Sequence, residues 1–232
     1  MIKENLQVTK DDITAACEKS SRAASEVTLI AVTKTKPLSM LWEAYEAGVR
    51  DFGENKVQEI LMKAPELPPD IRWHMIGHLQ KNKVRQIIDK VVLIHSVDSV
   101  ELSEVIEKEA AKRELHVDIL LEVNVAKEDS KSGFYEEELL DAVNKIAKFS
   151  HVHIKGLMTI APFVENSEEN RHIFKKLYEL CVDTKTKNID NVSMEILSMG
   201  MTVDYQVAIE EGASMIRVGT GIFGARTKIG EN

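Results

Sequence analysis

Short apolar runs and longer amphipathic stretches alternate along most of the chain. Eight runs are rich in β-branched and aliphatic residues and predict strands. They lie at residues 28–33, 50–53, 72–76, 91–95, 117–123, 153–157, 193–197 and 214–218. Apolar residues at helical spacing predict helices at 38–47, 80–89, 99–112, 135–148, 167–184 and 203–211. A further helix is predicted at 4–24, where Ile13, Ala16 and Cys17 share a face.

This order of elements favours a parallel sheet, because parallel neighbours need a crossover connection, which is usually a helix. Eight strand–helix units in 232 residues predict an α/β fold of the TIM (β/α)8 barrel type, at the compact end of its range. A doubly wound open sheet is the alternative that this count leaves open. No repeat or linker is evident, so we expect residues 1–232 to form a single barrel domain with an N-terminal helix.

The composition narrows the class of protein. The chain is 44% hydrophobic and 29% charged, which suits one sizeable core, and its formal net charge of -8 disfavours general nucleic-acid binding. Cys17 and Cys181 are the only cysteines and form no CxxC motif, so we expect a reducing, cytoplasmic setting without disulfides. The first twenty residues carry no apolar signal core, so we expect the mature chain to begin here and to have no membrane partner.

The first predicted strand ends at two lysines. In "TLIAVTKTKP" (28–37), Ile30, Val32 and Lys34 share a face, which places Lys34 at the inward carboxyl end of the strand, where barrel active sites lie. A lysine is a nucleophile only when neutral, and desolvation or a neighbouring ammonium such as Lys36 lowers its pKa. A solvated basic loop is the simpler interpretation of this stretch alone.

Small residues and glycines follow the last two predicted strands. "SMGMTVDYQVAI" carries Ser198, Gly200 and Thr202 ahead of a helix, and "RVGTGIFG" follows the eighth strand. In phosphate-binding barrels, these two loops present free backbone N–H groups and hydroxyls to the anion. Tight turns that merely require glycine are the alternative. A reactive lysine and a phosphate site in these places are the two ends of a pyridoxal 5'-phosphate (PLP) site.

Two further motifs resemble a dinucleotide site and a metal site, but their neighbouring residues argue against both. "GTGIFG" (219–224) matches G-x-G-x-x-G, but the eight residues after it leave no room for the helix, strand and acidic residue of a dinucleotide site. His74 and His78 have the spacing of a metal-binding pair, but Gly77 lies between them and the glutamate of a zinc-protease helix is absent. We therefore predict no metal site.

From about residue 5 to residue 226 the chain resembles the pyridoxal-phosphate homeostasis proteins, single-domain barrels similar to the N-terminal domain of alanine racemase, and this resemblance rests on seven motifs. The motifs are "AVTKTKP" (31–37), "FGENKVQE" (52–59), "WHMIGHLQKNK" (73–83), "SKSGF" (130–134), "GLMTIAP" (156–162), "LSMGMTVDYQVAI" (197–209) and "IRVGTGIFGAR" (216–226). Thr33 and Thr202 stand where serine is frequent in the family, a change that removes no cofactor contact.

The resemblance assigns roles to residues of this chain. It implies that Lys34 holds PLP as a reversible Schiff base, with Lys36 as its companion. It further implies that Ser198, Gly219 and Thr220 contact the phosphate, while Gly200 shapes the turn beside them. It places Asn55 next to the cofactor and Arg217 against the pyridine nitrogen.

An arginine at the pyridine nitrogen has a chemical consequence. A permanently protonated guanidinium donates to an unprotonated nitrogen, which leaves the ring a weaker electron sink than an aspartate partner would. The chain also ends soon after the eighth predicted strand, without the second domain of alanine racemase and its tyrosine base, and none of Tyr45, Tyr135, Tyr178 and Tyr205 is an obvious replacement. We therefore expect no catalytic residues and no catalytic turnover.

The leading hypothesis is a PLP-binding protein of intracellular PLP homeostasis and delivery. We expect PLP as cofactor, PLP-dependent apo-enzymes as recipients, no nucleic-acid partner, and a monomer, because no large exposed apolar segment is evident. Two alternatives stay open: a weak PLP-dependent amino-acid racemase, and a Schiff-base aldolase that acts on a sugar phosphate without a cofactor.

Overall fold

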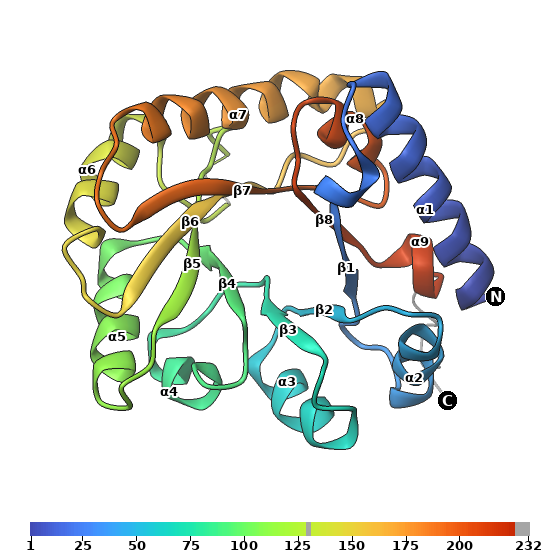
Figure 1. Ribbon diagram of the computed structural model, residues 1–232, viewed down its shortest axis with the longest axis horizontal. Helices are drawn as coiled ribbons and strands as arrows, with labels where there is room; N and C mark the ends of the chain where they lie inside the picture. The colour runs from blue at the N-terminus through green and yellow to red at the C-terminus, as the bar shows by residue number, and fades with distance from the viewer. Residues whose placement is uncertain (129–130, 226–232) are drawn as a thin grey trace.

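Eight parallel strands close into a barrel in the order of the sequence, β1 to β8, with β8 paired to β1 (Figure 1). The structure is a computed structural model that describes residues 1–128 and 131–225. Ser130, which begins one of the motifs quoted above, and Arg226, which ends another, lie outside the described residues. The strands are β1 (Thr28–Val32), β2 (Asp51–Glu54), β3 (Arg72–Met75), β4 (Leu93–Val97), β5 (Val117–Glu122), β6 (Val152–Met158), β7 (Val192–Met201) and β8 (Met215–Val218). The predicted barrel is confirmed, and the open sheet is excluded.

Helices surround the barrel. They are α1 (Ile2–Lys19), α2 (Leu38–Glu46), α3 (Val57–Lys63), α4 (Val84–Ile87), α5 (Val100–Ala111), α6 (Glu136–Ile146), α7 (Arg171–Thr186), α8 (Tyr205–Glu210) and α9 (Thr220–Phe223), with 3-10 turns at Ala24–Glu26, Ala64–Glu66, Lys81–Lys83 and Ser167–Asn170. The N-terminal helix α1 packs against α2, α8 and α9, so it completes the outer ring where α8 and α9 are short (Figure 1). No helix within residues 1–128 and 131–225 combines the length and the apolar character needed to cross a membrane.

Three differences from the predicted elements have local causes. The helix α1 ends at Lys19 rather than at residue 24, because Ser21 adopts a left-handed conformation with φ of 56°. The helices α3 and α9 were not predicted, since seven and four residues are too few for helical periodicity to register. The strand β7 runs on to Met201 through residues whose small size predicted a loop, and its register against β8 shifts between Ser198 and Met201.

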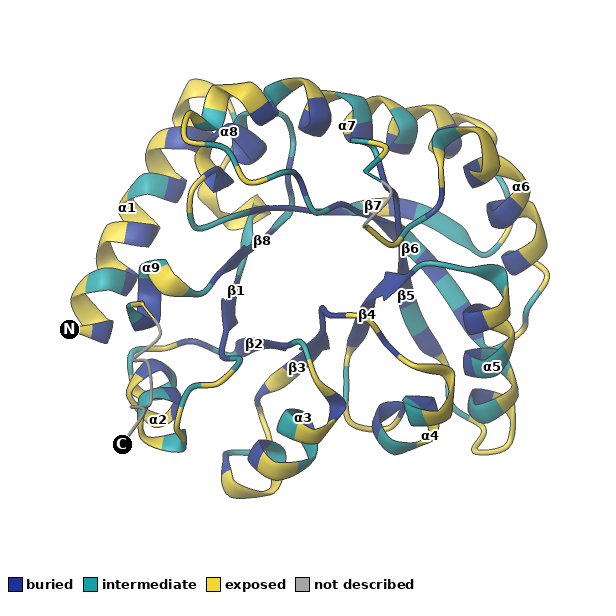
Figure 2. Cartoon of the chain, turned by 180° about the vertical axis from the view of Figure 1, so that it is seen from behind, coloured by how far each residue is buried: buried dark blue, intermediate teal, exposed yellow. Residues whose placement is uncertain are grey.

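Alternate residues of each strand face opposite sides of the barrel wall. Ala31, Phe52 and Trp73 are in register and belong to the large apolar cluster between the sheet and the helices. Figure 2 shows the same division, with buried strands and with helices exposed on their outer sides. The other set of residues faces the interior, where a second apolar cluster is formed by Leu93, Leu120 and Met158.

Register also places a set of polar residues inside the barrel. Ile30 is paired with Arg217, and Gly53 is paired with both Val32 and His74. A Cβ atom added to Gly53 would lie 2.8 Å from Ile30 Cγ2, so these two residues of adjacent strands lie close together on the same face of the wall. The interior of a (β/α)8 barrel is usually filled by branched apolar side chains, so the histidine and the arginine mark this interior as specialised.

Candidate functional site

Lys34 lies in a tight turn directly after β1. The strand ends at Val32, the Lys36 N–H donates to the Thr33 carbonyl at 3.0 Å, and Lys34 is half-buried. Thr35 in the same turn has φ of 63°, and its N–H donates to Glu59 Oε2 at 2.8 Å. Lys34 therefore follows the carboxyl end of β1 in a turn whose backbone is held in place by α3, and the inward direction of its side chain stays a prediction.

A buried ionic cluster supports this turn from behind β2. Lys63 Nζ donates to Glu54 Oε1 at 2.7 Å, to Glu59 Oε2 at 2.7 Å and to the Thr33 carbonyl at 2.8 Å. The Thr33 hydroxyl donates to the same oxygen of Glu54 at 2.6 Å. Burial raises the pKa of Glu54 and outweighs the hydrogen bonds from Lys63 and Thr33. The sequence reasoning missed this cluster, although an acidic residue at the end of an apolar strand was a visible signal.

Lys36 has a structural partner of its own. Its Nζ donates to the carbonyl oxygens of Phe223, Gly224 and Ala225 at 3.2, 2.9 and 3.3 Å, which lie at and just beyond the C-terminal end of α9. A cation at the carboxyl end of a helix satisfies carbonyl groups that have no partner within the helix. Lys36 therefore fastens the segment after β8 to the segment after β1, a role that the sequence did not reveal.

The loops after β7 and β8 meet at Thr202. Its Oγ1 accepts from the N–H groups of Gly219 and Gly221 at 3.4 and 3.3 Å, at the start of α9. Gly200 allows this approach: its φ is 90°, and a Cβ atom there would lie 2.6 Å from Ala208 Cβ. The two predicted loops do come together, because two N–H groups of the segment after β8 donate to a hydroxyl of the segment after β7.

Arg217 and Ser198 lie deeper, inside the barrel wall. Arg217 is 4% exposed, and it donates from Nη1 to Ser198 Oγ at 2.6 Å and from Nη2 to the Thr159 carbonyl at 2.8 Å. Desolvation lowers the pKa of Arg217 to about 10, so the guanidinium stays protonated at neutral pH. Ser198 is a residue of β7 rather than of the following loop, and its hydroxyl contacts Arg217 and His95.

Glu122 adds a titratable carboxyl to this interior. It ends β5, is 7% exposed and shares the inward side of the wall with Met158 and Ser198, because these three residues are in register. Desolvation and the nearby Asp98 carboxylate raise the pKa of Glu122 to about 7, against the opposing field of Arg217. The sequence reasoning missed it, since its perturbation depends on burial.

Asn55 lines a polar cavity at the carboxyl ends of β2 and β3. The cavity has a volume of about 460 Å³ and is lined by Asn55, Lys56, Val57, Gln58, His78, Gln80 and Lys83. A Cβ atom at Gly77 would lie 2.5 Å from the Asn55 carbonyl oxygen, so only glycine lets the two segments approach. His78 is hydrogen-bonded to Asp98 through Nδ1 at 3.1 Å and lies apart from His74, which faces the barrel interior.

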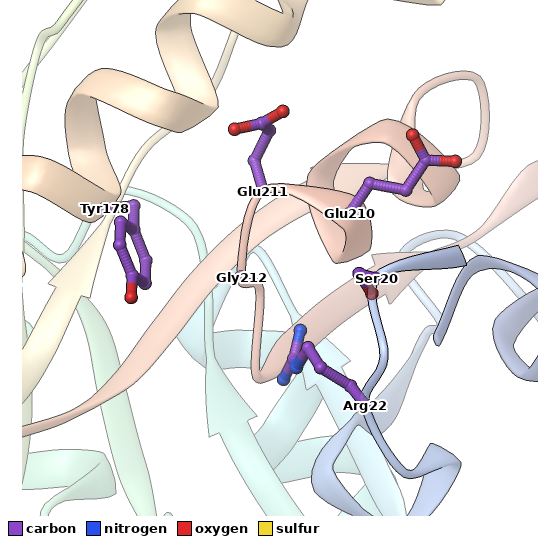
Figure 3. Close-up of a pocket in the computed structure, with 6 residues that line it drawn as sticks. All are labelled: Ser20, Arg22, Tyr178, Glu210, Glu211 and Gly212. Carbon is purple, nitrogen blue, oxygen red and sulfur yellow. The ribbon is translucent and has the colours of Figure 1, made fainter. Parts of the chain in front are cut away.

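The charged side chains around a second hollow, shown in Figure 3, bind other groups of the fold. The hollow is lined by Ser20, Arg22, Tyr178, Glu210, Glu211 and Gly212, near the end of α8, and so on the side of the barrel where β8 begins. Arg22 donates to two carbonyl groups, at 3.0 and 2.9 Å, and Arg171 binds both Glu210 and Glu211. Active sites of this fold lie at the opposite end, so we assign the site to the end that carries Lys34.

Known proteins resemble this chain over nearly its whole length. Residues 8–227 match the family model of the alanine racemase N-terminal domain. The pyridoxal phosphate homeostasis protein of Aquifex aeolicus is 42% identical over 96% of this chain and 97% of its own length, and that of Haemophilus influenzae is 36% identical over 97% and 96%. The structure of PipY from Synechococcus elongatus with PLP bound superposes with a TM-score of 0.83 at 34% identity, covering 97% of this chain and 100% of PipY.

More distant structures share the fold alone. An alanine racemase of Clostridium difficile is 12% identical to this chain and superposes with a TM-score of 0.74. The match covers 97% of this chain but 58% of the racemase.

Proposed function

This chain belongs to the alanine racemase N-terminal domain family and, within it, to the pyridoxal phosphate homeostasis proteins, and on that premise we propose that it binds PLP reversibly and functions in PLP homeostasis. The observation that carries the proposal is the convergence at one barrel end of three groups. These are the half-buried Lys34, the buried guanidinium of Arg217, and the N–H groups of Gly219 and Gly221.

The residues present fit the cofactor. The strands β1 and β8 are paired up to Ala31 and Val218, so the turn of Lys34 and the turn of Gly219 leave the sheet side by side. A Cβ atom at Gly219 would lie 3.4 Å from Val32 Cβ, which keeps the two segments in contact. PLP supplies an aldehyde that a neutral lysine amine can bind covalently and reversibly, and a dianionic phosphate that suits converging N–H groups.

Each group then has a defined task. Lys34 supplies the amine, Arg217 donates to the ring nitrogen, and the N–H groups of Gly219, Thr220 and Gly221 bind the phosphate. We assign the hydroxyl at the phosphate to Thr202, because it already lies against the N–H groups of Gly219 and Gly221.

The remaining predicted residues act around these groups. Ser198 was predicted as a phosphate contact; we propose instead that it acts through Arg217, to which its hydroxyl is bonded. Gly200 shapes the β7 end, where its positive φ brings the chain against α8, and Asn55 lines the neighbouring cavity beside the cofactor.

The role is binding rather than turnover. The protonated guanidinium of Arg217 favours an unprotonated ring nitrogen, and such a ring withdraws electrons weakly. The four tyrosines lie in helices of the outer ring or at their caps. The Tyr205 hydroxyl donates to Asp12 of α1 at 2.6 Å, and the Tyr45 hydroxyl to Asp70 at 2.9 Å. We further propose a cytoplasmic monomer that hands PLP to PLP-dependent apo-enzymes.

The test is borohydride reduction of the PLP-incubated protein followed by peptide mass spectrometry, with the visible spectrum recorded first. We expect a bleached yellow band and one pyridoxyl adduct, on Lys34. Lys34→Ala should abolish the adduct, and Lys56→Ala, which removes an exposed lysine of the nearby cavity, should leave it intact. An adduct scattered over surface lysines would contradict the proposal and favour the aldolase, and proton exchange at the α-carbon of a bound amino acid above that of free PLP would favour the racemase.

A further inference from the structure

A continuous line of hydrogen bonds crosses the interior of the barrel from Arg217 to Asp51. Arg217 Nη1 lies 2.6 Å from Ser198 Oγ, which lies 2.8 Å from His95 Nδ1. His95 Nε2 lies 3.0 Å from His74 Nδ1, and His74 Nε2 lies 3.0 Å from Asp51 Oδ1. The five residues come from β8, β7, β4, β3 and β2, so closure of the barrel is what brings them together.

The donors in this line all point the same way. Arginine has no acceptor, so Ser198 Oγ accepts from Arg217, and the serine proton is left for His95 Nδ1. Neutral His95 then carries its proton on Nε2 and donates to His74, whose own Nε2–H donates to Asp51. Each member between the two ends accepts one hydrogen bond and donates one, which is the only way to satisfy all of these buried atoms at once.

The charges along the line support this assignment. Burial, together with the field of Arg217, lowers the pKa of His95 well below its usual range, so the imidazole is neutral. Burial works to raise the pKa of Asp51, but hydrogen bonds from His74 and Arg72 outweigh it and keep the carboxyl ionised. The line therefore has a fixed anion at one end and a fixed cation at the other.

The line runs from the carboxyl half of β8 to the start of β2. Arg217 is the penultimate residue of β8, two positions before Gly219, whereas Asp51 is the first residue of β2. Arg72 donates to Asp51 from Nε at 2.7 Å and from Nη2 at 2.5 Å, and its side chain is 54% exposed. A group in contact with solvent at the far end is thus linked by hydrogen bonds to the arginine of the proposed site.

We propose that Asp51, His74 and His95 form a relay that positions and polarises Arg217 through Ser198, and that a change at Asp51 is felt at the ring nitrogen of PLP. The proposal rests on the proposed function for its last link only. By accepting the hydrogen bond of the Ser198 hydroxyl, His95 leaves the lone pairs of Ser198 Oγ to Arg217 and sets the orientation of the guanidinium. A packed apolar interior would hold the barrel together as well, so a fully hydrogen-bonded polar line here points to a task at Arg217.

The first measurement needs no PLP. Nitrogen NMR of the histidine side chains in the ligand-free protein should show His74 and His95 as neutral imidazoles protonated at Nε2. The same spectra of Asp51→Asn, in which a neutral amide replaces the carboxylate, should show the His95 resonances displaced, although His95 does not contact residue 51. A wild-type His95 protonated at Nδ1, or His95 resonances unchanged in Asp51→Asn, would overturn the relay.

The second measurement uses the PLP-loaded protein. His95→Phe should weaken PLP binding by about tenfold and shift the visible absorption maximum, whereas His95→Gln, which can still accept and donate, should stay within about threefold of wild type. Ile94→Val is the matched control, since this buried neighbour on β4 faces the helices, and it should change neither quantity. Equal values in His95→Phe, Asp51→Asn and wild type would refute the coupling.

The experiments can refute the proposed PLP binding and the proposed relay independently of each other. If the wild type binds no PLP, the proposed function is wrong, and the tautomers of the ligand-free protein still decide whether the relay exists. If His95→Phe does not fold, the spectra of Asp51→Asn and His95→Gln carry the test.

Discussion

Replacing Lys63 with methionine tests whether the buried ionic cluster holds the turn of Lys34. The change keeps most of the apolar stem and removes the ammonium that contacts Glu54, Glu59 and the Thr33 carbonyl. Glu54 is fully buried, so its carboxylate loses its cation without access to water. Breaking a buried ion pair in this way typically costs about 3 to 5 kcal/mol of the free energy of unfolding.

The pH dependence of this loss has a definite sign. The pKa of Glu54 is already raised in the folded protein, chiefly by burial, and loss of Lys63 raises it further. A protonated Glu54 needs no cation, so the deficit of Lys63→Met relative to wild type should be largest near pH 8 and should shrink as the pH is lowered toward 5.

Urea unfolding followed by circular dichroism measures these differences. Lys112→Met is the matched control, because Lys112 also pairs with a glutamate, Glu109, but is 54% exposed; it should unfold almost as the wild type does. The double variant Lys63→Met with Glu54→Leu should recover part of the loss, since no unpaired charge remains. A Lys63→Met variant as stable as Lys112→Met at pH 8, or a deficit that grows toward pH 5, would refute the reasoning.

Three further predictions concern the site and its frame. Glu122→Gln should be more stable than wild type by up to about 3 kcal/mol at pH 8 and hardly at pH 5. The reason is that the Glu122 carboxyl has a folded pKa of about 7, so it lowers the free energy of unfolding of the wild type as the pH rises toward that value. A difference between the two proteins that is the same at pH 5 and pH 8 in urea unfolding would contradict this. Gly200→Ala should lower the free energy of unfolding by more than about 1 kcal/mol, since left-handed backbone strain adds to a 2.6 Å approach of the new Cβ atom to Ala208. Gly48→Ala is the control for the strain alone, because Gly48 has φ of 94° and nothing within 4 Å of the added Cβ atom. Equal melting temperatures for the two variants would speak against the close approach. Thr202→Val should weaken PLP binding about tenfold in a spectral titration and Thr202→Ser should restore it, and an unchanged affinity in the valine variant would exclude the hydroxyl from the phosphate site.

Much of the fold was accessible from local patterns. The alternation of apolar runs with helical spacing predicted all eight strands and the N-terminal helix, because each pattern reflects burial on one face of a single element. The end of β7 escaped this reasoning. Residues 198–201 look like a loop, and they remain in the strand only because β6 and β8 supply partners on both sides and Gly200 tolerates a positive φ.

The sequence by itself determined that Lys34 follows the first apolar strand, that small residues follow the last two strands, and that several motifs resemble one family. These are properties of neighbouring residues, so no distant contact is needed to predict them. Only the tertiary structure decided that Lys36 fastens α9 and that Ser198 bonds to Arg217. It also decided the relay, whose histidines are 21 positions apart in sequence and meet because adjacent strands of a closed barrel point alternate residues at a common interior. Burial, a property of the whole fold, likewise raises the pKa of Glu122, which no local pattern could show.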